Sequence, residues 1–353
     1  TFMGFPFTSA RLDSIDGLKI ENSVRADQYT ESIRAINGAN KSAWKPYMGT
    51  NLTDPSLKWF VPGRGYAASL NAKVPDMPVS TTLIVPAQKG TIISDAASTL
   101  TDPVSYTETS RPWYDKGWNL IANPFARTAK FGSVPLWDAN PYTSGSIWLY
   151  IADQDAYDVI PTVSSYYTDN GLSAYGTFFI QTYSTATSTS TAEISTSSNG
   201  TAPLRTKAFP FSTTTEAKPE VFRVHLEGND LKYNTYVIFN DSARTEATAI
   251  EDAPTKGGLS GNSIQMSTYA AGSDLALSVN TLPFKGTSME VPLSVLISQQ
   301  GSYTFSLQES SKFKTVYLVD PAGGSHNISK GNYTANIDST GSFSYKLIFE
   351  KKD

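Results

Sequence analysis

The chain has 353 residues, of which 39% are hydrophobic and 17% charged, with a formal net charge of -4 at pH 7 and no cysteine. This charge leaves no basic footprint for nucleic acid, and the lack of cysteine excludes disulfides, thiol nucleophiles and cysteine-ligated metals. No apolar run approaches the roughly 18 to 20 residues of a membrane-spanning helix, and the length favours two domains.

Short strand-like segments follow one another along the chain, separated by turn residues, and many alternate apolar and polar side chains. The predicted strands are residues 66–74, 81–87, 146–152, 177–183, 221–228, 235–241, 274–280, 301–309, 315–320, 331–338 and 343–350. In 221–228, Val221, Arg223, His225 and Glu227 are expected to share one face, and Phe222, Val224 and Leu226 the other. No long helix is predicted, so the expected fold class is all-β, with two β-sandwich (jelly-roll or Ig-like) domains in tandem.

A stretch rich in Ser and Thr, residues 182–201, marks the predicted domain boundary, and all six Trp precede it. The predicted domains are therefore residues 1–202, which are rich in aromatic side chains, and residues 203–353. The stretch is either a flexible linker or an exposed hairpin in which residues 192–195 pair, and we favour the hairpin because Thr has good strand propensity.

Short motifs recur in the first domain in the same order, which predicts an internal duplication. The pairs are GFPF (4–7) with ANPF (122–125), AWKPY (43–47) with SIWLY (146–150), and WFVPGRGYAAS (59–69) with LSAYGTFFIQT (172–182).

The segment GWNLIANPF, residues 117–125, resembles the GWNLIGNPY-type motif of secreted and cell-surface proteins of the Bacteroidetes, which often use the type IX secretion route. In that family a Tyr-rich strand and a GxGFFV-like strand follow the motif, and residues 146–157 and 175–182 match them. The middle Gly of the motif is Ala122 here. We expect Trp118, Leu120 and Phe125 of this segment in the core, with Asn123 and Pro124 turning the chain.

The second domain carries a similar resemblance over residues 236–255 and 315–351. The resemblance implies an adhesin-like protein in an extracytoplasmic location, at the cell surface or secreted, and is silent about chemistry.

Catalytic motifs are missing from the sequence. The two histidines, His225 and His326, lie in a predicted strand and in the loop GGSHN, and neither forms part of a recognisable triad, metalloprotease or phosphate-binding motif. A pair of carboxylates for glycoside hydrolysis would not be visible in one sequence with 32 acidic residues. We therefore predict a protein that is not an enzyme, with glycoside hydrolysis left open.

Aromatic residues in turn-like segments of the first domain are the candidate ligand-binding residues, because exposed rings can stack on sugars or anchor a protein. They are Trp113, Tyr114, Tyr142, Tyr157, Tyr166 and Tyr167. The alternative is that these rings cap the ends of a sandwich whose core holds Trp118 and Trp148.

The acidic residues Asp153, Asp155 and Asp158 form the candidate metal site, since alternating carboxylates after a strand could hold Ca²⁺. The alternative is an ordinary solvated loop, because the Gly and bidentate Glu of an EF-hand are missing. No other cofactor is predicted.

The sequence thus predicts a non-enzymatic, adhesin-like surface module that binds an extracellular protein or glycan, or serves as an accessory region of a larger surface protein. It predicts no nucleic-acid partner and no span of the membrane. The alternatives are a carbohydrate-binding module of a glycan-degrading system and a pilus-type structural subunit.

Overall fold

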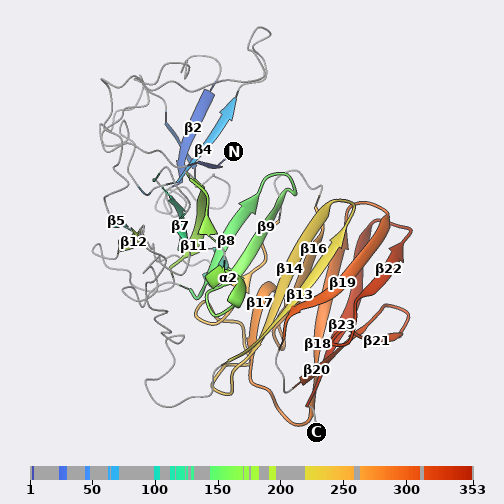
Figure 1. Cartoon of the computed structure of the whole chain (residues 1–353). Helices are drawn as coiled ribbons and strands as arrows, with labels where there is room; N and C mark the ends of the chain where they lie inside the picture. The colour runs from blue at the N-terminus through green and yellow to red at the C-terminus, as the bar shows by residue number, and fades with distance from the viewer. Residues whose placement is uncertain are drawn as a thin grey trace, which may run out of the picture. The chain divides into compact units, whose positions relative to one another are not determined.

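The computed structural model of the chain is nearly all β, with very little helix (Figure 1). It describes residues 2–3, 24–29, 44–47, 63, 65–70, 99–103, 112–115, 117–123, 125, 129–130, 144–169, 171–174, 176–182, 191–195, 219–257, 263–310 and 314–351. The predicted all-β class is confirmed at this level.

The chain divides into two compact units. The first comprises residues 1–143 and 168–206, and the second comprises residues 144–167 and 207–353. The predicted domains, 1–202 and 203–353, differ from these units chiefly in one segment, residues 144–167. This segment groups with the second unit because its side chains bond to strands between residues 220 and 309.

The first unit contains several short antiparallel arrangements. Its strands are β1 (Phe2–Met3), β2 (Val24–Tyr29), β3 (Trp44–Tyr47), β4 (Tyr66–Leu70), β5 (Thr99–Pro103), β6 (Trp118–Ala122), β7 (Ala129–Lys130), β10 (Gly171–Leu172), β11 (Thr177–Gln181) and β12 (Thr191–Ser195), with a 3-10 helix at Trp113–Asp115. One sheet has the order β1-β4-β2-β3, and the pairs β6 with β11, β5 with β12 and β7 with β10 are antiparallel.

Two sequence predictions for this unit can be compared with the strands. The Ser/Thr-rich stretch does form a strand, β12, but its partner is the distant β5 instead of a neighbouring hairpin strand. The predicted strand 81–87 and the first echo, residues 4–7, lie outside the described residues. Strands occur in both members of the other two echoes, at 44–47 and 146–151 and at 66–70 and 177–181, and the duplication stays a prediction.

The motif at residues 117–125 forms β6 and part of the core of the first unit. Trp118, Leu120 and Phe125 are buried, as the sequence predicts. The ring of Trp118 meets Phe179 of β11 edge to face, with centroids 6.3 Å apart. Edge-to-face packing of this kind adds to the free energy of apolar burial.

The residues at the two ends of the motif have specific backbone roles. The buried Asn123 accepts the N–H of Phe125 through Oδ1 at 3.1 Å, while its Nδ2 donates to two carbonyl oxygens at 172–173. Such a bond to the backbone two residues on is the way in which Asn makes a turn. Gly117 has a φ of 77°, and a Cβ there would lie 1.9 Å from the carbonyl oxygen of Thr182, so the position requires glycine.

The second unit contains most of the described strands. They are β8 (Ser146–Ile151), β9 (Ala156–Pro161), β13 (Glu220–Gly228), β14 (Leu231–Phe239), β15 (Ala253–Pro254), β16 (Gln265–Tyr269), β17 (Ala276–Leu282), β18 (Ser288–Ile297), β19 (Gly301–Glu309), β20 (Lys314–Val319), β21 (Ser325–Asn327), β22 (Tyr333–Ile337) and β23 (Gly341–Lys351). The short helix α2 (Ser165–Asp169) begins in this unit.

Strands β13 to β23 form one eleven-stranded sheet, in the order β21-β20-β23-β18-β16-β17-β14-β13-β19-β22 with β15 beside β17 (Figure 1). The pair β14–β17 is parallel, and the other described pairs of this sheet are antiparallel. Strand β13 shows why the residues fold in this way: Phe222, Val224 and Leu226 are fully buried, whereas Arg223 and His225 between them are only partly buried. The alternation therefore separates a core face from a polar face.

A long loop follows β14, and two buried carboxylates order it, one of which binds the backbone of β17. Asp252 accepts the N–H of Thr281 at 2.8 Å and the N–H of Thr248 at 2.7 Å, one with each oxygen. Glu251 accepts the N–H of Arg244 at 2.9 Å. Burial raises the pKa of Asp252 to about 7, against the two hydrogen bonds that lower it.

A buried lysine, Lys314, lies beside aromatic side chains of the second unit. The side chain of Lys314 is only 3% exposed, and its ammonium pairs with Glu220 at 2.5 Å. It also lies 4.3 Å from the ring centroid of Phe284 and 5.4 Å from that of Phe239. A charge in such a place is stable because a carboxylate and two aromatic faces replace its water.

We expect Glu220→Gln to lower the free energy of unfolding by about 3 kcal/mol, because it leaves the ammonium of Lys314 buried without its carboxylate. The matched control is Glu290→Gln, which breaks the Glu290–Lys346 pair, in which both side chains are about half exposed. That change should cost under about 1 kcal/mol. Urea unfolding measures both, and equal costs would contradict the role of burial.

We expect the pH dependence of stability to report Asp252. In the unfolded chain its carboxyl ionises near pH 4, whereas in the folded chain it keeps its proton up to about pH 7. Its contribution is therefore fully present below about pH 4 and is lost as the pH rises to about 7. In Asp252→Asn, which does not titrate, urea unfolding should show a flatter pH profile over this window, and an unchanged slope would refute the assignment.

Candidate functional site

The structure places the predicted aromatic residues in different environments. The rings of Tyr157 and Tyr167 are only 5% and 4% exposed, so they are not available for stacking on a ligand. Tyr166 is partly buried beneath the guanidinium of Arg223, which lies 4.4 Å from its ring centroid. These three rings therefore pack against other parts of the chain, and the ligand-binding role of the six candidate residues stays a prediction.

The other aromatic candidates belong to the first unit. Trp113 and Tyr114 are partly exposed and meet edge to face, with centroids 5.8 Å apart. Both are also held by the backbone, since the carbonyl of Trp113 accepts from Gln181 and that of Tyr114 accepts from the Trp118 indole. Tyr142 lies outside the described residues.

The three candidate calcium ligands do not converge. Asp153 is exposed, and the buried Asp155 accepts a hydrogen bond from the Tyr150 hydroxyl at 2.9 Å. Asp158 lies farther along, on β9, and accepts from Asn234 at 3.0 Å. The part of the chain that the structure describes holds no group of three or more His, Asp or Glu side chains that could bind a metal ion.

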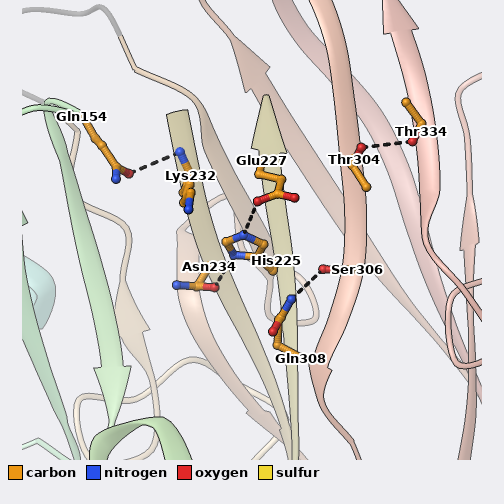
Figure 2. A network of polar contacts seen from close by, with 9 residues as sticks. All are labelled: Gln154, His225, Glu227, Lys232, Asn234, Thr304, Ser306, Gln308 and Thr334. Atoms are coloured by element: carbon orange, nitrogen blue, oxygen red, sulfur yellow. Dashed lines mark hydrogen bonds and ion pairs between the residues drawn. The ribbon is translucent and has the colours of Figure 1, made fainter. Parts of the chain in front are cut away.

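A larger set of polar side chains gathers on the second unit, and we call it the polar face. Figure 2 shows these side chains close together on β13, β14, β19 and β22, with one from the turn between β8 and β9. They are Gln154, His225, Glu227, Lys232, Asn234, Thr304, Ser306, Gln308 and Thr334. They share a face because the alternation of each strand turns the intervening apolar residues into the core.

The pairing register aligns part of this set in a row. Thr334 lies opposite Thr304, Thr304 opposite Glu227, and Glu227 opposite Lys232. The row crosses four neighbouring strands, which is roughly 14 Å at a strand spacing of about 4.8 Å. The two threonine hydroxyls are 3.0 Å apart, and Glu227 and Lys232 are exposed.

A chain of hydrogen bonds connects the polar face to the partly buried carboxylate of Asp158. Asn234 donates through Nδ2 to Asp158 at 3.0 Å, which leaves its Oδ1 facing Nδ1 of His225 at 2.9 Å. Because an amide oxygen can only accept, Nδ1 of His225 carries the hydrogen. The other ring nitrogen, Nε2, lies 3.5 Å from the carboxylate of Glu227.

Asp158 is the most deeply buried acid of this network. Burial raises its pKa, while the hydrogen bond from Asn234, the charges of Arg223 and His225 and the hydroxyl of Tyr166 lower it. Burial also raises the pKa of Tyr166, and the nearby Asp158 adds to that shift. The hydroxyl of Tyr166 therefore serves as a donor to Asp158 and stays protonated.

The second histidine belongs to a separate cluster. Nε2 of His326 lies 2.8 Å from Oδ2 of Asp320, and its ring stacks on Tyr333 with centroids 3.6 Å apart. Asp320 also accepts the N–H groups of Ala322 and Gly324 and the hydroxyl of Tyr333. The hydrogen bond from His326 and those from the backbone hold the pKa of Asp320 below its usual value.

This cluster has a structural role. His326 lies on β21 and Tyr333 on β22, the strands at the two ends of the sheet order. The side chains therefore link the two terminal strands of the sheet. The hydroxyl of the neighbouring Ser325 is not among the groups that the cluster holds, and the arrangement is not that of a nucleophile with its base.

Comparison of the chain with models of protein families, with curated proteins and with solved structures finds no match. Among the described residues, no helix is both long enough and apolar enough to cross a membrane.

We expect Trp148→Phe to loosen residues 146–161 selectively. The buried indole of Trp148 donates to the carbonyl of Pro254 at 2.9 Å, and the change leaves that carbonyl without its donor, at a cost of about 1 to 3 kcal/mol. Hydrogen exchange followed by mass spectrometry should show faster exchange in 146–161. In the control Trp113→Phe, which changes a partly exposed ring of the first unit, this region should be unchanged.

Proposed function

We propose that the chain is an extracytoplasmic, non-enzymatic, adhesin-like module, at the cell surface or secreted, that binds a glycan on the polar face. The observation that carries the proposal is the row Thr334, Thr304, Glu227 and Lys232, which presents hydroxyl, carboxylate and ammonium groups across four strands. A sugar hydroxyl both donates and accepts, so it suits a surface on which donors and acceptors lie side by side. This proposal joins the adhesin and carbohydrate-binding hypotheses.

Three further observations support it. The resemblance of residues 117–125 to a motif of Bacteroidetes surface proteins favours an extracellular partner. Both histidines are committed to hydrogen bonds, His225 to Asn234 and His326 to Asp320, which favours a binding role over catalysis. The bonds below the row, from His225 through Asn234 to Asp158, hold these side chains in place, and a pre-ordered surface loses less entropy when it binds.

We also propose that the two units are β-sandwich domains of jelly-roll or Ig-like type, in tandem. In the second unit this is supported by one apolar cluster that draws buried side chains from strands along the whole sheet order. Its members include Phe222, Val237, Leu293, Phe305 and Leu347. A core between two packed layers would bring such distant strands into contact.

A glycan array tests the proposed function. We expect selective binding to a neutral oligosaccharide, with Thr304→Ala and Lys232→Ala each weakening the affinity about five- to tenfold, since each removes one hydrogen-bonding group worth about 1 to 1.5 kcal/mol. The matched control is Lys346→Ala, which removes an exposed lysine from β23 and should leave the affinity unchanged. No binding on a broad array, or equal effects of all three changes, would sink the proposal.

A further inference from the structure

The row of polar groups that crosses β22, β19, β13 and β14 has a second, shorter line of polar groups beside it. Ser302 on β19 lies opposite Asn336 on β22, and its hydroxyl donates to the amide oxygen of Asn336 at 2.6 Å. Both side chains are exposed. They stand two residues from Thr304 and Thr334 along the same strands, so they share that face and lie about 7 Å from the row. The exposed polar groups therefore form a strip that runs across the strands.

The neutral groups of this strip keep hydrogen-bonding capacity for a partner outside the sheet. The hydroxyls of Thr304 and Thr334 are 3.0 Å apart on neighbouring strands (Figure 2), so one donates to the other and one hydroxyl hydrogen remains. The amide oxygen of Asn336 is engaged by Ser302, which directs the two amide hydrogens of Asn336 away from that residue. Both pairs thus offer a hydrogen to a ligand, and their oxygens keep lone pairs that can accept one.

The two charged groups of the row favour a neutral ligand. Glu227 and Lys232 are exposed and lie opposite each other on β13 and β14, with opposite signs. A ligand that carried one charge on each of its units would meet a like charge at one of these two residues, and a like-charge contact works against binding. A neutral hydroxyl can accept from the ammonium and donate to the carboxylate.

The length of the row exceeds one sugar. It presents one polar group on each of four neighbouring strands, over roughly 14 Å at a strand spacing of about 4.8 Å. In an extended β-linked chain, one sugar is close to one strand spacing in length, so successive sugars meet successive strands. An α-linked chain that winds into a helix curves away from such a straight row, and a branch would lift the chain from the face.

We propose that the polar face takes an extended, unbranched, neutral β-linked polysaccharide chain, which lies along the row with one sugar over each of the four strands. This inference rests on the proposed function, because it names the class of glycan for the same site. Ser302 and Asn336 widen the site over β19 and β22, where a sugar meets two polar groups of a strand instead of one.

Calorimetric titration of the whole chain with oligosaccharides of one to six sugars tests the proposal. The probes are β-1,4-linked series of glucose, mannose and xylose, with an α-1,4-linked glucose series for comparison. In at least one β-linked series, the affinity should rise about five- to tenfold with each added sugar and level off at four, because each sugar adds one hydrogen-bonding group. The α-linked series should show no such rise.

The outcomes separate this inference from the proposed function. Equal affinity at every length, tighter binding of the α-linked series, or array binding confined to other linkages would overturn the inference and leave the proposed function standing. No binding to these probes or to any glycan of a broad array would overturn both.

A variant of β22 tests the alignment of the chain with the row. Thr334→Ala combined with Asn336→Ala removes two exposed polar groups of this strand, so the rise in affinity should now level off at three sugars. Affinity for the three-sugar probe should be unchanged, since three strands remain. The matched control is Ser344→Ala, which removes an exposed hydroxyl from β23 and should leave the whole series unchanged. An equal loss at every length in the β22 variant would contradict the alignment.

Discussion

A carboxylate that is withdrawn from water has to be hydrogen-bonded, and in this chain the requirement of the partly buried Asp158 orders the groups around it. Asp158 accepts from the amide of Asn234, which fixes the orientation of that side chain. The amide oxygen of Asn234 then faces His225 and sets the position of its hydrogen. The other nitrogen of His225 is thereby directed at Glu227, which lies in the exposed row of the polar face. The positions of exposed side chains on the polar face thus depend on the partly buried Asp158 beneath them.

The same carboxylate explains how a hairpin from the middle of the chain joins strands that come much later. Asp158 is carried by β9, and its donor Asn234 by β14. At the start of α2, the carboxylate of Glu309 likewise accepts hydrogen bonds with both oxygens, one from Ser164 and one from Ser165. Polar bonds fix where the segment lies, while the apolar contact of Ala156 with the core adds to the free energy of that placement.

The strands were largely predictable because their alternation is local. The prediction of 301–309 matches β19 residue for residue, and the expected common face of Arg223, His225 and Glu227 is found in β13. From the sequence, residues 153–158 are interpreted as a loop, either an ordinary solvated one or one that holds calcium, whereas residues 156–158 belong to β9. Acidic side chains on the outer positions of a strand look, in sequence, the same as ligands in a loop. The hydrogen-bond partner distinguishes the two cases, and for Asp158 this partner is Asn234, 76 residues away in the sequence.

The candidate site was less predictable for a related physical reason. Lys232, Asn234, Thr304 and Gln308 are single polar residues in strands, and nothing in the sequence distinguishes them before the register is known. Only the pairing of β13 with both β14 and β19 brings them onto one surface. The burial of the rings was equally unpredictable from the sequence. Tyr157 and Tyr167 have the same side chain as an exposed tyrosine, and only their neighbours in the fold cover them. Composition therefore indicated aromatic binding residues where the structure uses two of the rings for packing.

The position of β23 has a consequence for the order in which the molecule can be made. This strand, the last one described, pairs with β18 on one side and β20 on the other, from Gly341 to Lys351. Strands β20 and β21 are joined to the rest of the sheet order only through it. As the chain leaves the ribosome from its N-terminus, the second unit cannot complete its sheet until residue 351 has emerged.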